Sequence, residues 1–292
     1  MRKIYKRLFA ISCVLVLLIG CGSLPAYAAE VSAKQVRERV VITCTEIPLY
    51  AGGDYLGSGF LVDGVTYIPL LTFTEHMLGE DCDVAWDQET NTASITSDSL
   101  ALSLTVSNGI MVANGRYLLF EDGLYNVNGT IIVPIRELAK VFSLGLEWDA
   151  EDWTIRIDDS AFRVLAPGEE FYDETDLYWL SRVIFSEAGT QPLAGMIGVG
   201  NVVINRLNDE YSRFGASIFD VIFQPGQFDV VRNGTIYNEP SDSAVVAAKL
   251  CLEGYNTVGD SKWFLNPSIG ISTWMWTYRT LECSIADHEF YA

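Results

Sequence analysis

The chain has 292 residues, 49% hydrophobic and 20% charged, which suffices for two globular domains and excludes a disordered protein. Its 19 basic residues against 38 acidic ones give a net charge of −19. This excludes a general nucleic-acid binder and charge-driven docking on an anionic membrane. Only His76 and His288 are present, so a metal site built from several histidines is excluded, and we expect neither a metal nor a cofactor.

Residues 1–28 have the pattern of a secretory signal peptide. A basic start, residues 1–7, precedes an apolar run, residues 8–20, that is shorter than the about 20 residues of a spanning helix. Ala26-Tyr27-Ala28 fits cleavage after Ala28, whereas residues 18–21 resemble a lipobox that would place a lipid anchor on Cys21. Both ways of processing the signal peptide remain open, and each predicts an exported protein, either secreted or a lipoprotein.

Four cysteines follow this segment: Cys44, Cys82, Cys251 and Cys283. An exported protein can form disulfides, and four cysteines allow three pairings. Because two lie in each half of the chain, we expect Cys44–Cys82 and Cys251–Cys283, with four free thiols as the alternative.

The first half of the chain contains a repeat. Residues 64–69 and 129–134 each place a proline five residues after a glycine, and a helix-like stretch follows, at residues 71–78 and 135–142. A Trp-Asp pair comes next, at Trp86 and Trp148, with an isoleucine nine residues further on. The shared order of strand, helix and hairpin indicates a duplication and predicts a small α+β domain over residues 36–158.

These Gly…Pro and Trp-Asp elements resemble the copper amine oxidase N-terminal-like domain, an accessory module of secreted bacterial proteins. The resemblance implies a role in binding the wall or in spacing. It does not imply copper, because His76 is the only histidine of this region. Residues 159–174 are acidic and contain Pro167-Gly168, which indicates a linker.

The second half begins with two predicted helices. Apolar spacing predicts a helix over residues 176–188 with Asp176 as its N-cap and Glu187 in its last turn. Pro192 suits the start of the next helix, residues 193–207, which carries small residues: Ala194, Gly195, Gly198 and Gly200. Small residues allow close helix packing, and a carboxyl desolvated between helices has the raised pKa that a general acid needs.

Several ordered motifs follow from here to the end of the chain. Ser186-Glu187-Ala188-Gly189-Thr190-Gln191-Pro192 is followed by Asn205-Arg206, then residues 220–228, 264–267 and 285–291. Together they resemble the spore-cortex-lytic (cell wall hydrolase) family. The resemblance implies a mainly helical, lysozyme-like catalytic domain over residues 175–292 that cleaves peptidoglycan glycan strands with Glu187 as its catalytic acid. Gly189-Thr190 and Gln191 depart from the Arg-Gly and Glu of the family pattern.

The remaining candidate residues would bind the glycan: Gln191, Gln227, Phe228, Tyr237, Trp263 and His288. Structural roles are the alternative for each of them. Asn205 and Arg206 are expected to hold the end of their helix.

The reaction itself has three candidate forms. A lytic transglycosylase needs one carboxylate, and with Gln191 in place of a glutamate no second one lies near Glu187 in sequence, which favours this form. A glycoside hydrolase (muramidase or glucosaminidase) would need a second carboxylate, for which Asp229 and Glu239 are the candidates. A degenerate domain that binds the wall without cutting it is the third.

Overall fold

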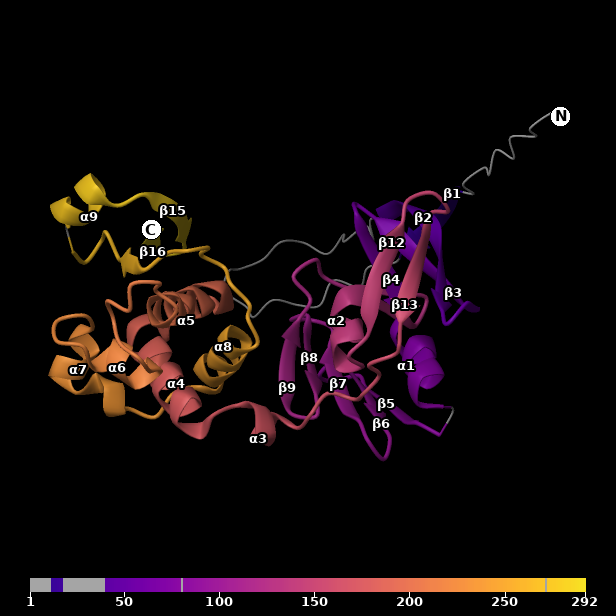
Figure 1. Ribbon diagram of the computed structural model, residues 1–292, viewed down its shortest axis with the longest axis horizontal. Coiled ribbons are helices and arrows are strands. Elements are labelled where there is room, and N and C mark those ends of the chain that lie inside the picture. The colour runs from indigo at the N-terminus through magenta and orange to yellow at the C-terminus, as the bar shows by residue number, and fades with distance from the viewer. Residues whose placement is uncertain (1–11, 18–39, 80, 271) are drawn as a thin grey trace, which may run out of the picture. The chain divides into compact units, whose positions relative to one another are not determined.

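The computed structural model describes residues 12–17, 40–79, 81–270 and 272–292 (Figure 1). The predicted cleavage after Ala28 and the predicted lipid anchor at Cys21 lie outside these residues. The chain divides into two compact units: an amino-terminal unit up to Asn114 with Leu118–Ala166, and a carboxy-terminal unit of Pro167–Ala292 with Gly115–Tyr117. Each unit is described by itself.

Two antiparallel-rich sheets and two helices build the amino-terminal unit. The larger sheet has the order β10-β11-β4-β3-β2-β13-β12, with β1 also on β2. Its strands are β1 (Ser12–Leu17), β2 (Val40–Ala51), β3 (Asp54–Val62), β4 (Val65–Pro69), β10 (Tyr125–Val127), β11 (Thr130–Pro134), β12 (Gly145–Asp149) and β13 (Thr154–Asp158). The smaller sheet runs in chain order through β5 (Asp83–Asp87), β6 (Thr92–Thr96), β7 (Ala101–Thr105), β8 (Ile110–Ala113) and β9 (Arg116–Leu119).

The two copies of the repeat adopt the same order of elements. In the first, β4 leads through Pro69 into α1 (Leu70–Leu78) and the β5–β6 hairpin. In the second, β11 leads through Pro134 into α2 (Ile135–Val141) and the β12–β13 hairpin. β4 and β11 pair antiparallel with each other, but the hairpins go to different sheets: β6 pairs with β7, whereas β13 pairs in parallel with β2.

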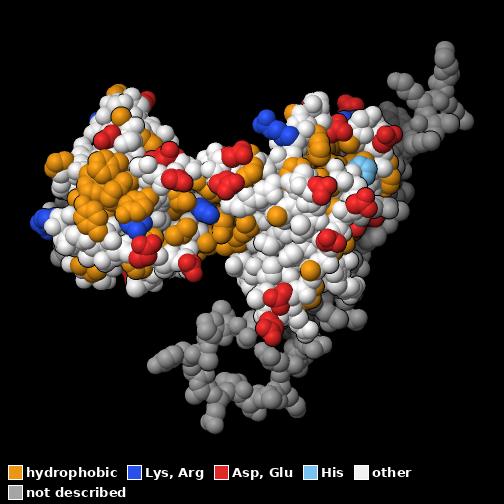
Figure 2. Space-filling model, turned by 90° about the horizontal axis from the view of Figure 1, so that it is seen from below, with side chains coloured by type: hydrophobic (Ala, Val, Ile, Leu, Met, Phe, Trp, Pro, Cys, Tyr) orange, Lys and Arg blue, Asp and Glu red, His pale blue; other side chains and the backbone are white. Residues whose placement is uncertain are grey.

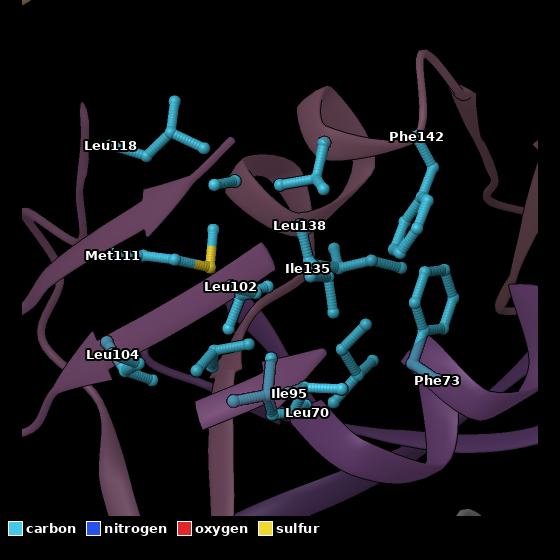
Figure 3. Packing of buried hydrophobic residues seen from close by; sticks show 14 of the residues in the cluster. Leu70, Phe73, Ile95, Leu102, Leu104, Met111, Leu118, Ile135, Leu138 and Phe142 are labelled. Carbon is cyan, nitrogen blue, oxygen red and sulfur yellow. The ribbon is translucent and has the colours of Figure 1, made fainter. Parts of the chain in front are cut away.

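Both helices of the repeat bury one face in a shared core. Leu70 and Phe73 of α1 meet Ile135, Leu138 and Phe142 of the second copy, all under 6% exposed (Figure 3). Strands of the smaller sheet supply the other side of the core through Ile95, Leu102, Leu104 and Met111. Burial of so many large aliphatic and aromatic side chains is the main source of this unit's stability.

The carboxy-terminal unit is mainly helical. Its helices are α3 (Gly168–Phe171), α4 (Glu174–Ala188), α5 (Leu193–Leu207), α6 (Ile218–Phe223), α7 (Asp229–Asn233), the short 3-10 helix η1 (Thr235–Tyr237), α8 (Asp242–Leu252) and α9 (Thr273–Tyr278). A small sheet of order β14-β16-β15 closes the unit, from β14 (Trp263–Leu265), β15 (Leu281–Ile285) and β16 (His288–Tyr291). The predicted α+β class, with a small α+β domain ahead of a mainly helical one, is confirmed.

The start of α4 differs from the sequence prediction. Asp173, and not Asp176, is the N-cap: its Oδ1 accepts hydrogen bonds from the backbone N–H groups of Thr175 and Asp176. A cap must sit outside the helix and accept from residues two and three positions on, which Asp173 does. Asp176 lies instead within the first turn, where its negative charge suits the positive end of the helix.

The predicted disulfides are wrong: the structure contains neither Cys44–Cys82 nor Cys251–Cys283. Cys44 is buried in a small cluster with Val62, whereas Cys82 packs against the main core and its thiol donates to the Gly79 carbonyl. The Cys251 thiol donates to the Ile197 carbonyl inside the helical packing, and Cys283 lies on β15. The presence of two cysteines in each half of the chain did not mean that the two lie close enough in space to form a disulfide.

The small residues of α5 allow the close packing that their spacing predicts. A Cβ on Gly200 would lie 2.6 Å from Cys251 Sγ and 2.9 Å from Ile184 Cδ1. A Cβ on Gly198 would lie 2.8 Å from the ring of Phe290. Neighbouring elements therefore approach α5 to a distance that only glycine permits.

Candidate active site

Glu187 lies in the last turn of α4 and is half-buried. The same helix buries Leu180, Val183 and Ile184 completely, which fixes its rotation about its axis. The neighbouring Ser186 hydroxyl donates to the Thr235 carbonyl at 3.0 Å and ties this end of α4 to η1. The carboxyl group is thus held on a rigid element, close to the segment that runs from α7 to η1.

Burial raises the pKa of Glu187 to about 7. The negative charge of Asp229 adds to this increase, and the positive charge of Arg206 opposes it. Within the described residues, the Glu187 carboxyl has no hydrogen-bond partner. Its position at the carboxy end of a helix also disfavours the ionised form, because the unpaired carbonyls there carry partial negative charge. Such a carboxyl can hold a proton near neutral pH and give it away, as a general acid must.

Arg206 of α5 is the cation that acts on Glu187. Its Nε donates to the Lys262 carbonyl at 2.7 Å, and its guanidinium lies 5.2 Å from the ring centre of Phe214 and 5.0 Å from that of Phe228. It is 4% exposed, and burial lowers its pKa to about 10. Its Nη1 is buried with no hydrogen-bond partner among the described residues. This donor is therefore not used by another protein group among these residues.

Asn205, the neighbour of Arg206, has the structural role that we predicted for it. Its side-chain amide donates to the carbonyls of Gly259 and Ser261, at 2.8 and 2.9 Å. These bonds fix the loop that precedes β14 to the end of α5. The prediction for Arg206 was incomplete. Arg206 anchors this loop as Asn205 does, but its charge also interacts with that of Glu187, which was not predicted.

The two candidates for a second carboxylate differ sharply. Asp229, the first residue of α7, influences the pKa of Glu187, but its side chain is 81% exposed and pairs with Arg232 at 3.0 Å. Glu239 is 86% exposed, pairs with the buried Arg182 at 2.7 Å, and is not among the charges that shift the pKa of Glu187. Only Asp229 is therefore close enough to Glu187 to act with it electrostatically.

Gln191 and His288 are enclosed by protein groups. The Gln191 side-chain amide donates to Asp287 Oδ2 at 3.0 Å, and its carbonyl accepts from the Asp287 backbone at 3.2 Å. Both ends of the amide are used, so Gln191 joins the start of α5 to the β15–β16 turn. His288 is 6% exposed, packs edge-on against Phe264 and Phe290, and has a pKa lowered by burial.

The other predicted glycan contacts divide into buried and exposed residues. Phe228 is 5% exposed and packs beneath Arg206 and beside Phe264, which is a core position. Trp263 lies against Phe214 with the Arg279 guanidinium 3.8 Å from its ring centre. Gln227 and Tyr237 are exposed. Of these residues, Gln227 and Tyr237 are therefore the ones most open to a ligand.

A surface cluster of aromatic side chains was not predicted from the sequence. Trp179 of α4 meets Phe219 and Phe223 of α6 and Tyr237 of η1, with ring centres 4.9 to 6.2 Å apart. Hydrophobic side chains gather visibly on this face of the carboxy-terminal unit (Figure 2). The four-residue spacing of Phe219 and Phe223 was the available signal, but their meeting with Trp179 depends on the fold.

The described part of the chain has no group of three or more His, Cys, Asp or Glu side chains that could hold a metal ion. Within the same residues, no helix is long and apolar enough to cross a bilayer.

Two known families match the two halves of the chain. Residues 55–157 match the copper amine oxidase N-terminal domain, and residues 190–291 match the Cell Wall Hydrolase family, a segment that begins just after Glu187. The cell wall hydrolase CwlJ of Bacillus subtilis is 30% identical over 120 residues, which cover 84% of that protein and 40% of this chain. The chain belongs to the cell wall hydrolase family.

Spore cortex-lytic enzymes match over a similar length of this cell wall hydrolase. The spore cortex-lytic enzyme of Oceanobacillus iheyensis is 32% identical over 119 residues, 41% of this chain and 42% of that enzyme. The chain thus spans less than half the length of that relative. A solved structure, the catalytic domain of the germination-specific lytic transglycosylase SleB from Bacillus anthracis, is 28% identical, with a TM-score of 0.39, covering 44% of this chain and 100% of that domain.

Proposed function

We propose that this cell wall hydrolase cleaves the glycan strand of peptidoglycan as a lytic transglycosylase, with Glu187 as its single catalytic carboxyl group. The observation that carries the proposal is the half-buried Glu187, whose pKa is raised to about 7. Similarity to a spore cortex-lytic enzyme supports a substrate in the cell wall.

The reaction follows from one carboxyl group used twice. Protonated Glu187 gives its proton to the glycosidic oxygen as the bond from that oxygen to the anomeric carbon of N-acetylmuramic acid breaks. The resulting carboxylate takes the proton of the 6-hydroxyl of the same sugar while that oxygen bonds to the anomeric carbon. The products are a 1,6-anhydro sugar and a free hydroxyl, and Glu187 is protonated again. Arg206 stabilises the carboxylate between the two steps.

The second candidate is a true glycoside hydrolase that uses Asp229 beside Glu187. It is favoured by the electrostatic influence of Asp229 on Glu187 and disfavoured by the exposure of Asp229 and its ion pair with Arg232. A hydrolase would hold an attacking water or form a covalent intermediate with the second carboxylate.

Mass spectrometry of digested peptidoglycan tests the proposal. We expect anhydro-muramic ends from the wild-type protein, no products from Glu187→Gln, and undiminished products from Glu239→Gln, the matched control at an exposed glutamate. Reducing ends, heavier by one water, would show a hydrolase. Equal product from Glu187→Gln would overturn the assignment of the acid.

Action on the wall also requires export, which residues 1–28 would provide. We propose that the protein acts outside the cytoplasmic membrane. If the wild-type protein stays in the membrane fraction and a Cys21→Ala variant does not, the protein has a lipid anchor. If the wild-type protein is released to the medium, the signal peptide is cleaved and no lipid anchor is present.

A further inference from the structure

The amino-terminal unit contains a groove to which the comparisons give no ligand. It has a volume of about 890 Å³ and lies along α2, between that helix and the strands β3, β4, β12 and β13. Small-ligand sites have volumes of about 300–1,000 Å³. The groove lining includes Trp148 together with charged side chains from α2 and its neighbours: Asp122, Arg136, Glu137, Lys140 and Glu147.

Trp148 of the groove lining is paired with a second exposed tryptophan, Trp153, which contacts Trp148 but is not itself part of the lining. Trp148 is 46% exposed and Trp153 is 54% exposed, and their rings meet edge to face with centres 5.8 Å apart. Aromatic side chains normally bury most of their area, so two rings held against each other in solvent are unusual. The π face of such a ring attracts the weakly positive C–H groups on the flat face of a sugar ring.

The backbone at Trp153 gives an independent sign of function. Trp153 has φ of +55°, a left-handed conformation that is strained for a bulky residue. The corresponding residue of the first copy is Asn91, with φ of +52°, and asparagine accepts this conformation readily. The two hairpins therefore need the same turn, but the second copy places a large aromatic residue there against its backbone preference. Strained backbone conformations are concentrated at functional sites, which favours a functional use of this side chain.

The charges of the groove narrow the class of ligand. Arg136 is exposed on α2 and, among the residues that the structure describes, has no carboxylate partner, whereas Lys140 is 3.8 Å from Glu137. Arg136 can therefore receive a carboxylate from a ligand. The acidic side chains of the groove lining can accept hydrogen bonds from hydroxyl and amide groups of a ligand. They repel a polymer that carries a negative charge on every unit.

We propose that this groove binds a carboxylate-bearing oligosaccharide, with its sugar rings stacked on Trp148 and Trp153 and its carboxylate on Arg136. The choice of alternating N-acetylglucosamine and N-acetylmuramic acid as that saccharide rests on the proposed function. It applies to glycan without stem peptides, because a stem peptide occupies the carboxyl group of N-acetylmuramic acid in an amide bond. The amino-terminal unit would then hold peptide-free wall glycan at a second site, separate from the Glu187 site.

The first copy of the repeat supplies a matched control. Trp86 occupies the same hairpin position as Trp148 and is 47% exposed, but it does not line the groove and has no aromatic ring partner within the described residues. Removing Trp86 deletes as much exposed aromatic surface as removing Trp148 without touching the proposed site.

Calorimetry on the full chain tests the proposal, with Glu187→Gln in every sample to prevent turnover. The probes are the tetrasaccharide of alternating N-acetylglucosamine and N-acetylmuramic acid, and uncharged chitotetraose. For the first probe we expect two sites in the parent and one after Trp148→Ala or Trp153→Asn. Trp86→Ala should retain both sites. Arg136→Gln should weaken groove binding of the acidic probe at least fivefold and leave binding of chitotetraose unchanged.

Trp153→Asn also separates lost binding from lost folding. This change restores the residue that the first copy uses, so the unfolding temperature should rise or stay the same while the site is lost. Two sites retained in the Trp148→Ala, Trp153→Asn double variant would overturn the inference, even if the wild-type protein lyses peptidoglycan. Loss of one site in that variant would uphold it even if no lysis occurs, so the groove and the proposed activity are tested separately.

Discussion

Glu187 shows how a single side chain acquires its chemistry from its surroundings. Desolvation is the largest cause of its raised pKa, and the carboxylate of Asp229 and the guanidinium of Arg206 act in opposite directions on it. Because the protonated form must donate to the glycosidic oxygen, kcat/KM for peptidoglycan lysis should fall as pH rises through about 7. A turbidity assay over a series of buffers measures this limb of the profile.

Asp229→Asn distinguishes an electrostatic role of Asp229 from a catalytic one. Loss of its negative charge lowers the pKa of Glu187, so the falling limb should move to lower pH by up to about one unit, as expected for one exposed charge. The rate at pH 5 should stay within about threefold of wild type. A loss of about a hundredfold or more at all pH values would instead make Asp229 a second catalytic carboxylate. Arg232→Gln, which changes the other member of the exposed ion pair, is the matched control.

The elements of the site could be predicted from sequence where the signal was local. Apolar spacing placed Glu187 in the last turn of α4, and Pro192 marked the start of α5, which begins at Leu193. The contacts of Arg206 with Lys262 and of Gln191 with Asp287 join residues far apart in the chain. No local pattern encodes such partners, and for that reason the site around Glu187 was predicted only in outline.

The two repeat hairpins show the same limit at the level of strands. Their sequence patterns match, and both form as predicted, but β5–β6 joins the smaller sheet and β12–β13 the larger one. Which sheet a hairpin joins depends on the edge that long-range packing leaves open to it. The disulfide prediction failed for the same reason, because spacing along the chain carries no information on distance through the fold.

Close packing around α5 gives a prediction about an element. Gly200→Ala would place a Cβ 2.6 Å from Cys251 Sγ and 2.9 Å from Ile184 Cδ1, so α8 or α4 must move. We expect the free energy of unfolding to decrease by about 1–3 kcal/mol, the usual cost of overpacking a core. Urea denaturation of both variants measures it, with Gly270→Ala as the control, since nothing lies within 4 Å of a Cβ at that position. Equal stability of the two variants would show that α5 has room to spare.

At the scale of the whole molecule, hydrophobic burial rather than covalent links must account for stability. Each unit has its own buried side chains, and the structure has no disulfide among its described residues. Reductant should therefore leave the thermal unfolding curve of the protein unchanged within about 1 °C, whereas loss of a disulfide typically costs about 2–5 kcal/mol. A drop of several degrees in calorimetry with and without dithiothreitol would reinstate a disulfide.

The position of β16 has a consequence for biosynthesis. This strand is the middle one of its sheet, and Phe290 packs on Gly198 of α5 with no exposed surface. The packing around α5, the helix that follows the Glu187 segment, is therefore incomplete until residues 288–291 have been made. A nascent or prematurely terminated chain that lacks them exposes the apolar side of α5 and is a natural target for chaperones and proteases. Complete packing of this domain therefore requires a chain that has been translated through β16.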